Sequence, residues 1–326
     1  MNRAKTFLLL ALALCFGLTF LAPRMNPYHL DVAIGVGINI ILAVSLNLIN
    51  GYTGQFSLGH AGYMAVGAYT AAMLTTTVGK TFLAMLGGPA NPIAVPLVFI
   101  LALISGGLAA ALTGWLVGVP SLRLRGDYLA IVTLGFGEII RIVLQNMEPV
   151  GGALGLKGIP PYTTLAWTFG VAVITIYAVV ALVHSTYGRG FIAVHDDEIA
   201  SEAIGINTTR YKVTAFVIGA FFAGVAGGLY GHFKQFISPD GFGFMRSIEI
   251  VVMVILGGMG NTVGVILAAV LLTLLPEMLR IVPDVRMIVY SLLLVVLMIV
   301  APRGLFHAGW WRGITNRLRP NRNRAS

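Results

Sequence analysis

The sequence predicts an all-α fold: a polytopic helical membrane protein of about eight to ten transmembrane helices, given the helix length that a bilayer requires. Hydrophobic residues make up 57% of the 326 residues and charged residues 10%, whereas soluble domains have about 45–50% and about 25%. The apolar residues are gathered into runs, and many runs reach the roughly 20 residues that cross a bilayer as a helix. These observations indicate a chain that lies mostly within a membrane.

Ten apolar segments are the expected spans. In order they cover residues 6–22, 29–49, 58–77, 95–117, 127–146, 163–184, 212–232, 247–259, 262–279 and 285–301. The third begins in glycine-rich sequence and the eighth is short, so either could be re-entrant or broken. The first resembles a signal peptide, but no small residues mark a cleavage site after it, and we expect an uncleaved span.

Basic residues near the span ends predict the orientation. With the N-terminus inside, thirteen Lys and Arg residues lie in inner segments and seven in outer segments, while Arg141 lies within a span. Inner segments of membrane proteins are enriched in Lys and Arg, so we expect both termini in the cytosol and an even number of crossings. No stretch outside the spans is long enough for a separate folded domain. Residues 1–305 are therefore expected to form one multi-pass membrane domain.

The positive charge of the chain is concentrated at its C-terminus. Six arginines lie in the last 24 residues, and such a cluster beside a span is typical of a cytosolic tail that faces lipid headgroups. Residues 306–326 are the expected tail, and we expect no nucleic-acid partner despite the net charge of +9. Cys15 is the only cysteine, which excludes an intramolecular disulfide.

Residues 50–69 are rich in glycine and contain Gln55, Ser57 and His60. Irregular backbone at membrane depth occurs only where it is buried in protein or faces a water-filled cavity. One interpretation is a broken helix beside a translocation path, with Gln55 and His60 on that path. The other is close helix packing, with both side chains hydrogen-bonded to the backbone. The sequence alone leaves both open.

Glu138 and Arg141 are charged residues within a predicted span. They are three residues apart, so they can pair on one helical face. Because an unpaired charge costs about 2.5–3.5 kcal/mol at the bilayer centre, we expect a pair in a protein-lined interior or near the end of the span. The pair could belong to the translocation path or serve the structure alone.

Small residues recur every four positions in the seventh span, at Gly219, Ala223, Gly227 and Gly231. Such a stripe lets neighbouring helices approach closely, so helix packing is the expected role. The run 257–264 lacks the lysine of a Walker A phosphate loop, and we interpret it as a sharp turn. The sequence has no zinc-type spacing, nucleophile elbow or paired catalytic carboxylates. We therefore expect no catalytic site, cofactor or metal on this chain.

A polar segment, residues 186–212, separates two apolar runs and contains four of the twelve acidic residues. We expect a short helix here. Helices that lie on a membrane surface favour Lys and Arg on their polar face, so the acidic residues indicate a protein partner instead. Glu198 and Glu202, four residues apart, repel each other mildly, a cost that a basic partner could offset.

Several blocks of the sequence resemble branched-chain amino acid ABC transporter permeases of the LivM type. They are Ser45–Gly62, Leu122–Arg141, Asp196–Tyr230 and Ile255–Asn261, followed by Leu275–Glu277 and Ala301–Leu305. Long blocks in this order make the resemblance specific. One departure concerns the wider family's coupling motif, in which three residues separate Glu-Ala-Ala from a glycine, because here four residues separate Ala200 from Gly205.

The resemblance implies the permease subunit of an importer in the bacterial inner membrane. A LivH-type sister permease would complete the pore, two cytosolic ATPase subunits would drive it, and a periplasmic binding protein would deliver leucine, isoleucine or valine. Related permeases handle urea, short amides or aromatic acids, so these substrates stay open. ATP-driven closure of the ATPases would push on residues 186–212, the coupling segment, and open the path to each side in turn. The residues expected at this contact are Arg189, Asp196, Asp197, Glu198, Ala200, Glu202, Ala203 and Gly205.

A self-contained, ion-coupled secondary transporter is the alternative from a different class. Glu138 and Arg141 would then be ion-coupling groups. Transport by this chain alone, driven by an ion gradient and independent of ATP, would favour that alternative.

Overall fold

The computed structural model describes residues 17, 26–85, 91, 93–121, 126–281, 286–300 and 304. The longer helices are α2 (Pro27–Asn47), α3 (His60–Thr76), α5 (Ala94–Ser121), α6 (Asp127–Asn146), α7 (Leu165–Val183) and α10 (Thr208–Lys234). The shorter ones are α4 (Val78–Met85), α8 (Gly188–Asp196), α9 (Glu198–Ala203), α11 (Phe244–Gly257), α12 (Thr262–Met278) and α13 (Arg286–Val300). A π-helical turn, η2 (Leu48–Tyr52), extends α2, and the 3-10 turns are η3 (Glu148–Val150), η4 (Gly152–Leu154), η5 (Pro239–Phe242) and η6 (Leu279–Ile281).

The expected polytopic helical fold is confirmed. Within the described residues, five helical segments are long and apolar enough to cross a membrane: Pro27–Tyr52, Ala94–Pro120, Tyr128–Asn146, Leu165–Val183 and Thr208–Lys234. The third, eighth, ninth and tenth expected spans coincide with α3, α11, α12 and α13, which are not among these five segments. Apart from Gly17, the expected first span lies outside the described residues, as does the tail at 306–326.

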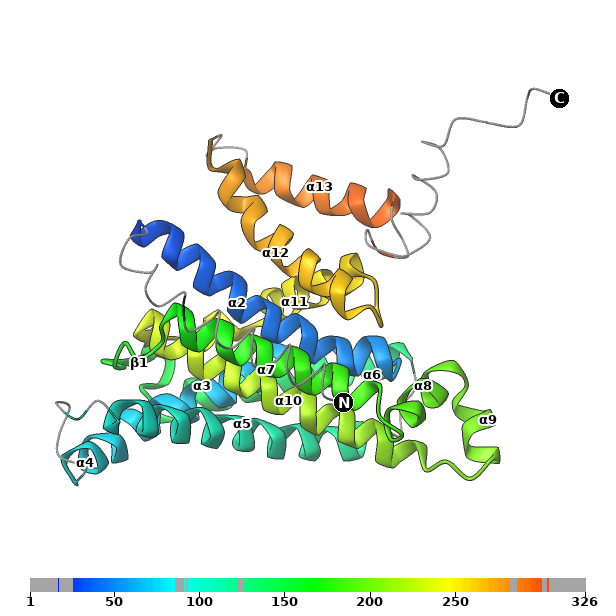
Figure 1. The fold of residues 1–326 in the computed structure, drawn as a ribbon, viewed down its shortest axis with the longest axis horizontal. Helices are drawn as coiled ribbons and strands as arrows, with labels where there is room; N and C mark the ends of the chain where they lie inside the picture. The colour runs from blue at the N-terminus through cyan, green and yellow to red at the C-terminus, as the bar shows by residue number, and fades with distance from the viewer. Residues whose placement is uncertain are drawn as a thin grey trace.

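Figure 1 shows α2, α3, α5, α7 and α10 running side by side along the long axis of the molecule, with α12 and α13 to one side. The α2–η2 segment is central, because 83% of its most apolar window is buried, whereas only 22% of that window is buried in α6. The outward faces of α5 and α6 carry exposed leucine and isoleucine side chains. Such faces suit a surface surrounded by lipid.

Small residues let the central helices touch. Gly219, Gly227 and Gly231 of α10 face η2 and α3, where a Cβ on Gly227 would lie 2.0 Å from the carbonyl oxygen of Met64. Ala223, in the same stripe, is fully buried. Gly224, one position on, faces α5, and its Cβ would lie 2.4 Å from that of Ala110. The first small-residue face of α10 therefore packs on η2 and α3, and the second packs on α5 as well as α3.

The bundle has two ends with different polar groups. At the α9 end, where α8 and α9 project from the bundle in Figure 1, α8 packs on η2 and α9 packs on α8 and α10. At the opposite end, the η5 end, Lys234 lies 3.4 Å from Asp31. A short antiparallel pairing of β1 (Leu156–Lys157) with β2 (Phe236–Ile237) joins two loops there. The sequence did not predict these two-residue strands, which are too short to carry a periodic pattern.

Candidate functional site

The coupling segment folds into two short helices rather than the one expected. The helix breaks at Asp197, whose backbone is extended and whose carboxylate caps α9 by accepting hydrogen bonds from the N–H groups of Ile199 (2.9 Å) and Ala200 (3.0 Å). Aspartate is a favoured N-cap residue for this reason. Gly205, with φ of +85°, then ends α9 in the left-handed conformation that glycine adopts without strain.

Contacts with the start of α10 hold α8 and α9, the two helices of the coupling segment, in place. The ammonium of Lys212 lies 2.6 Å from Oε1 of Glu198, and the hydroxyl of Thr208 donates to Glu202 at 2.7 Å. Gly190 lies against the ring of Tyr211, where a Cβ would come within 2.2 Å. Glu198 thus has a basic partner within the same chain, Lys212.

The tip of the coupling segment exposes apolar and acidic groups together. Ile199 and Ile204 are 68% and 77% exposed, although both lie beside charged residues at the polar α9 end. Neither isoleucine was among the predicted contact residues. The predicted contact residues that are exposed are Arg189, Asp196, Asp197, Ala200, Glu202, Ala203 and Gly205. Glu198 is half-buried against Lys212. Exposed apolar side chains with charged neighbours offer a surface on which another protein can bind.

The predicted irregularity after the second span is present. Residues 53–59 are non-helical, and most of them are buried. The amide of Leu58 donates to Oγ1 of Thr133 at 3.0 Å, and Nε2 of His60 lies 2.9 Å from the hydroxyl of Ser45. His60, the first residue of α3, therefore lies at the depth of Ser45, which is seven residues before Tyr52 at the end of η2. At about 1.5 Å per helical residue, α3 begins about 10 Å inside that end of the bundle. The break therefore lies within the protein, as irregular backbone at membrane depth requires.

The break has features of both interpretations. Gly59 and Gly62 pack closely on α6, where a Cβ would lie 2.3 Å from the carbonyl oxygen of Thr133 and 3.0 Å from Cα of Gly137. Gln55 donates to the backbone carbonyl of Thr53 at 3.2 Å, as the packing interpretation expects. His60, fully buried, contacts both the hydroxyl of Ser45 and the backbone of Leu42.

Four buried polar atoms near the break have no hydrogen-bond partner within the described protein. They are Nδ2 of Asn47, Oγ of Ser57, Nδ1 of His60 and Oη of Tyr63. An unsatisfied buried polar atom costs about 1–3 kcal/mol, so a group of four beside one turn is unusual in a stable core.

A polar hollow of about 180 Å³ separates the break from the coupling segment. Gln55 and Gly54 line one side, and His195, Glu198 and Lys212 line the other. Gly54 has a φ of +66°, and a Cβ there would lie 3.0 Å from Cδ2 of His195. The non-helical segment and α8 are thus in direct contact at the α9 end.

Glu138 and Arg141 do pair, near the end of α6 that points to η5. Nε of Arg141 lies 2.7 Å from Oε2 of Glu138, and its Nη1 lies 3.0 Å from Oδ1 of Asp240. The three groups line an open hollow of about 500 Å³ together with Arg246 and Glu249. The structure therefore separates the predicted path residues: Gln55 lies at the α9 end, His60 in the interior, and the charged pair at the η5 end.

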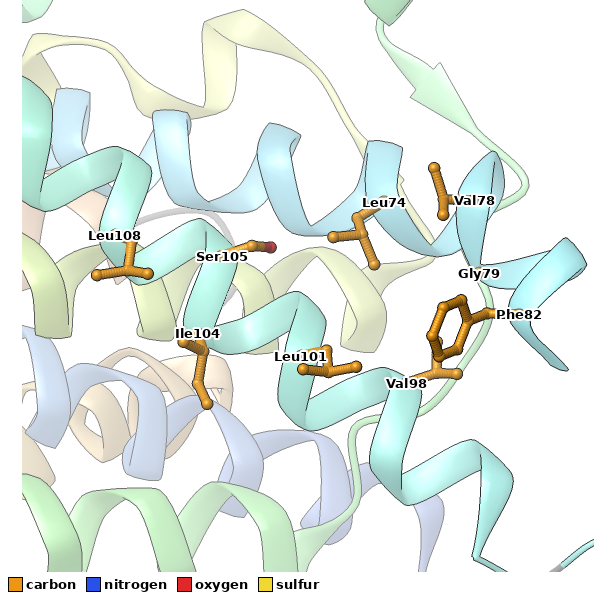
Figure 2. A pocket seen from close by; sticks show the side chains of 9 residues that line it. All are labelled: Leu74, Val78, Gly79, Phe82, Val98, Leu101, Ile104, Ser105 and Leu108. Atoms are coloured by element: carbon orange, nitrogen blue, oxygen red, sulfur yellow. The ribbon is translucent and has the colours of Figure 1, made fainter. Parts of the chain in front are cut away.

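Another pocket, between α3, α4 and α5, is apolar. It has a volume of about 330 Å³, and Figure 2 shows its lining side chains: Leu74, Val78, Gly79, Phe82, Val98, Leu101, Ile104, Ser105 and Leu108. The hydroxyl of Ser105, the one polar side chain among these nine, donates to the carbonyl of Ala102. The pocket offers no free polar group to orient a charged solute.

Sequence reasoning missed Lys212 and Asp240 as partners of the candidate groups. A lysine at the start of an apolar span was a signal for Lys212, because it needs a counter-charge. Nothing in the sequence pairs Asp240 with Arg141, 99 residues away. Within the described residues, no cluster of three or more His, Cys, Asp or Glu side chains could hold a metal ion.

Comparison with known proteins identifies the family. The family described as the branched-chain amino acid transport system permease component matches residues 28–301. The high-affinity branched-chain amino acid transport system permease protein LivM of Salmonella typhimurium is 37% identical over 93% of this chain and 75% of its own length. LivM of Escherichia coli is 36% identical with the same coverage.

A second type of permease is a more distant relative. LivH of Salmonella typhimurium is 24% identical over 81% of this chain and 90% of its own length. No solved structure matches the chain. The family match over most of the sequence and the identity with two LivM proteins show that this chain belongs to the branched-chain amino acid transport system permease family.

Proposed function

We propose that this chain is a permease subunit of an ATP-driven importer of branched-chain amino acids in a bacterial inner membrane. Family membership supports the transport role. The LivM and LivH relatives are each named as permease proteins of a high-affinity branched-chain amino acid transport system. A LivH-type sister permease would complete the pore, a periplasmic binding protein would deliver the solute, and two cytosolic ATPase subunits would supply the energy.

The observation that carries the ATP-driven part is the form of the coupling segment. Its tip exposes Ile199 and Ile204, while Lys212 holds its base through Glu198. A rigidly held apolar tip can receive a push from a soluble partner, whereas a loosely attached loop would absorb it. The excess of inner basic residues supports placing this end in the cytosol.

The same contacts suggest how the push would reach the path. Movement of α9 would act on α10 through the Glu198–Lys212 pair. Movement of α8 would act on the break through the contact of His195 with Gly54. Helix α10 packs against α3, and the break leads directly into it. A tilt of the coupling segment would therefore shift the start of α3 and open the path to each side in turn.

Reconstitution tests the proposal. The chain would be purified with its candidate sister permease and ATPases, placed in proteoliposomes, and supplied with the binding protein and labelled leucine, isoleucine or valine. We expect uptake that requires ATP and all partners. Uptake by this chain alone, driven by a proton or sodium gradient without ATP, would overturn the proposal in favour of a secondary transporter. Uptake of urea, short amides or aromatic acids instead would keep the importer and replace its substrate.

A further inference from the structure

We infer that the first turn of α3 is a binding point for the carboxylate of the transported solute, with Ser57, His60 and Tyr63 as its side-chain contacts. The inference rests on the proposed function and adds the residues that would hold the carboxylate of the solute. Three features of the structure support it: the helix begins inside the protein, unpaired polar groups lie beside its first turn, and that turn lies between two polar hollows.

The helix start supplies a positive end in the protein interior. Gly59, the residue before α3, has no side chain to cap the helix, and His60 is fully buried. The N–H groups of a first helical turn attract carboxylates, and half-helix N-termini at the bilayer midplane bind the substrate carboxylate in some transporters. The amide of Ala61 donates to the hydroxyl of Ser247, a neutral acceptor that a carboxylate could replace.

The unpaired groups are an independent sign of a ligand. Oγ of Ser57, Nδ1 of His60 and Oη of Tyr63 have no hydrogen-bond partner within the described protein. All three residues are at most 1% exposed. The rings of His60 and Tyr63 meet edge to face at 6.1 Å, so they share one face of the helix start. The hydroxyl groups of Ser57 and Tyr63 can both donate to a carboxylate.

The helix start also lies between the two polar hollows. Towards η5, Gly62 packs on Gly137, and the next residue of α6, Glu138, lines the charged hollow. Towards α9, the non-helical segment leads to Gln55, which lines the smaller hollow. The helix start thus lies between two open polar sites at opposite ends of the bundle. A solute that passed between these hollows along α3 would reach the helix start on the way.

The chemistry selects among the substrates of related permeases. Branched-chain amino acids and aromatic acids carry a carboxylate, whereas urea and short amides do not. A helix N-terminus with two hydroxyl donors favours the first group, because hydrogen bonds to a charged acceptor are stronger than those to a neutral one.

Conservative variants test the contacts in the complete importer. Tyr63→Phe and Ser57→Ala each remove only a hydroxyl that has no partner in the structure, so the folded state should lose no hydrogen bond. The matched controls are Tyr69→Phe and Thr175→Val, at buried hydroxyls that bond Ile237 and Val171 of this chain. The readout is the maximal leucine uptake rate at saturating loaded binding protein, alongside the melting temperature.

We expect Tyr63→Phe and Ser57→Ala to lower the maximal rate about tenfold or more, since each loses a hydrogen bond to a charged group, with the melting temperature unchanged or raised. The controls should stay within about twofold of the unsubstituted importer, because they lie away from the proposed contact. Equal rates in all four variants would overturn the inference. If the unsubstituted importer fails to transport leucine with ATP, the proposed function fails instead, which separates the two failures.

A thiol at position 57 provides a second test that does not depend on the size of a rate change. Ser57→Cys in a Cys15→Ser background would be treated with an anionic and a cationic methanethiosulfonate of similar size. We expect modification during ATP turnover, faster with the anionic reagent and slowed by leucine-loaded binding protein. A thiol that stays unreactive during turnover, or that prefers the cationic reagent, would contradict a carboxylate site.

Discussion

Lys212 and Glu198 join α9 to the long helix α10 through a nearly buried ion pair. Nζ of Lys212 lies 2.6 Å from Oε1 of Glu198, and the lysine side chain is only 2% exposed. Removing one partner of a buried pair is strongly destabilising, because the other charge stays buried and uncompensated. The pair links α9 to the base of α10, whose small-residue faces pack on η2, α3 and α5.

Lys212→Met should therefore lower the melting temperature of the purified chain and weaken its association with the ATPases. The double variant Lys212→Met with Glu198→Gln should recover part of the loss, with a coupling energy of about 1–3 kcal/mol as is typical for contacting residues. Thermal unfolding in detergent measures the loss of stability in the single variant and its recovery in the double variant. Lys212→Arg, which keeps the charge, is the control. Purely additive losses would mean that the two side chains do not interact.

The glycine contact between α10 and α3 gives a second prediction. Gly227→Ala places a Cβ 2.0 Å from the backbone oxygen of Met64. The backbone of α3 or α10 must move to make room for it. We expect a loss of about 1–3 kcal/mol in stability, as overpacking usually causes. Gly170→Ala in α7 is the matched control, because its Cβ would meet nothing within 4 Å. Similar melting temperatures for the two variants would show that the helices are not in close contact at Gly227.

The contact of Gly54 with His195 predicts a defect in energy coupling. Gly54→Ala and Gly126→Ala both place a side chain at positive φ, +66° and +60°, but only the first Cβ meets another residue within 4 Å. Each should lose about 1–3 kcal/mol, because a side chain is strained at positive φ. Gly54→Ala should in addition lower the leucine transported per ATP hydrolysed, measured in proteoliposomes. An equal ratio in both variants would remove this contact from the coupling route.

Arg141 provides a test of the ion-coupled alternative. It bonds Glu138 and Asp240 at the partly exposed η5 end, where ion pairs contribute about 0–1 kcal/mol. Arg141→Gln should therefore change stability little and leave uptake dependent on ATP. Uptake would be measured with and without a protonophore, under conditions that hold the ATP concentration constant. A variant whose uptake loses its dependence on an ion gradient would instead indicate a secondary transporter.

The sequence predicts the helical fold well because span length and apolar composition are local properties. The break after α2 could also be predicted, because the glycines and polar residues at 50–69 are unsuited to a regular lipid-facing helix. The pairing of Arg141 with Asp240 could not be predicted, because it depends on how η5 packs on α6. The coupling segment was expected as one helix, and the extended backbone at Asp197 divides it. A single aspartate is compatible with one continuous helix or with two helices separated at that residue.

Site-specific crosslinking tests the central claim most directly, that the tip of the coupling segment contacts the ATPases. A photoreactive amino acid would be placed at Ile199, which is 68% exposed at the α9 end, and separately at Leu154, which is 82% exposed towards the η5 end. In native membranes the account predicts a crosslink from position 199 to an ATPase subunit and none from position 154. A crosslink from position 154 to the ATPase, with none from position 199, would contradict it.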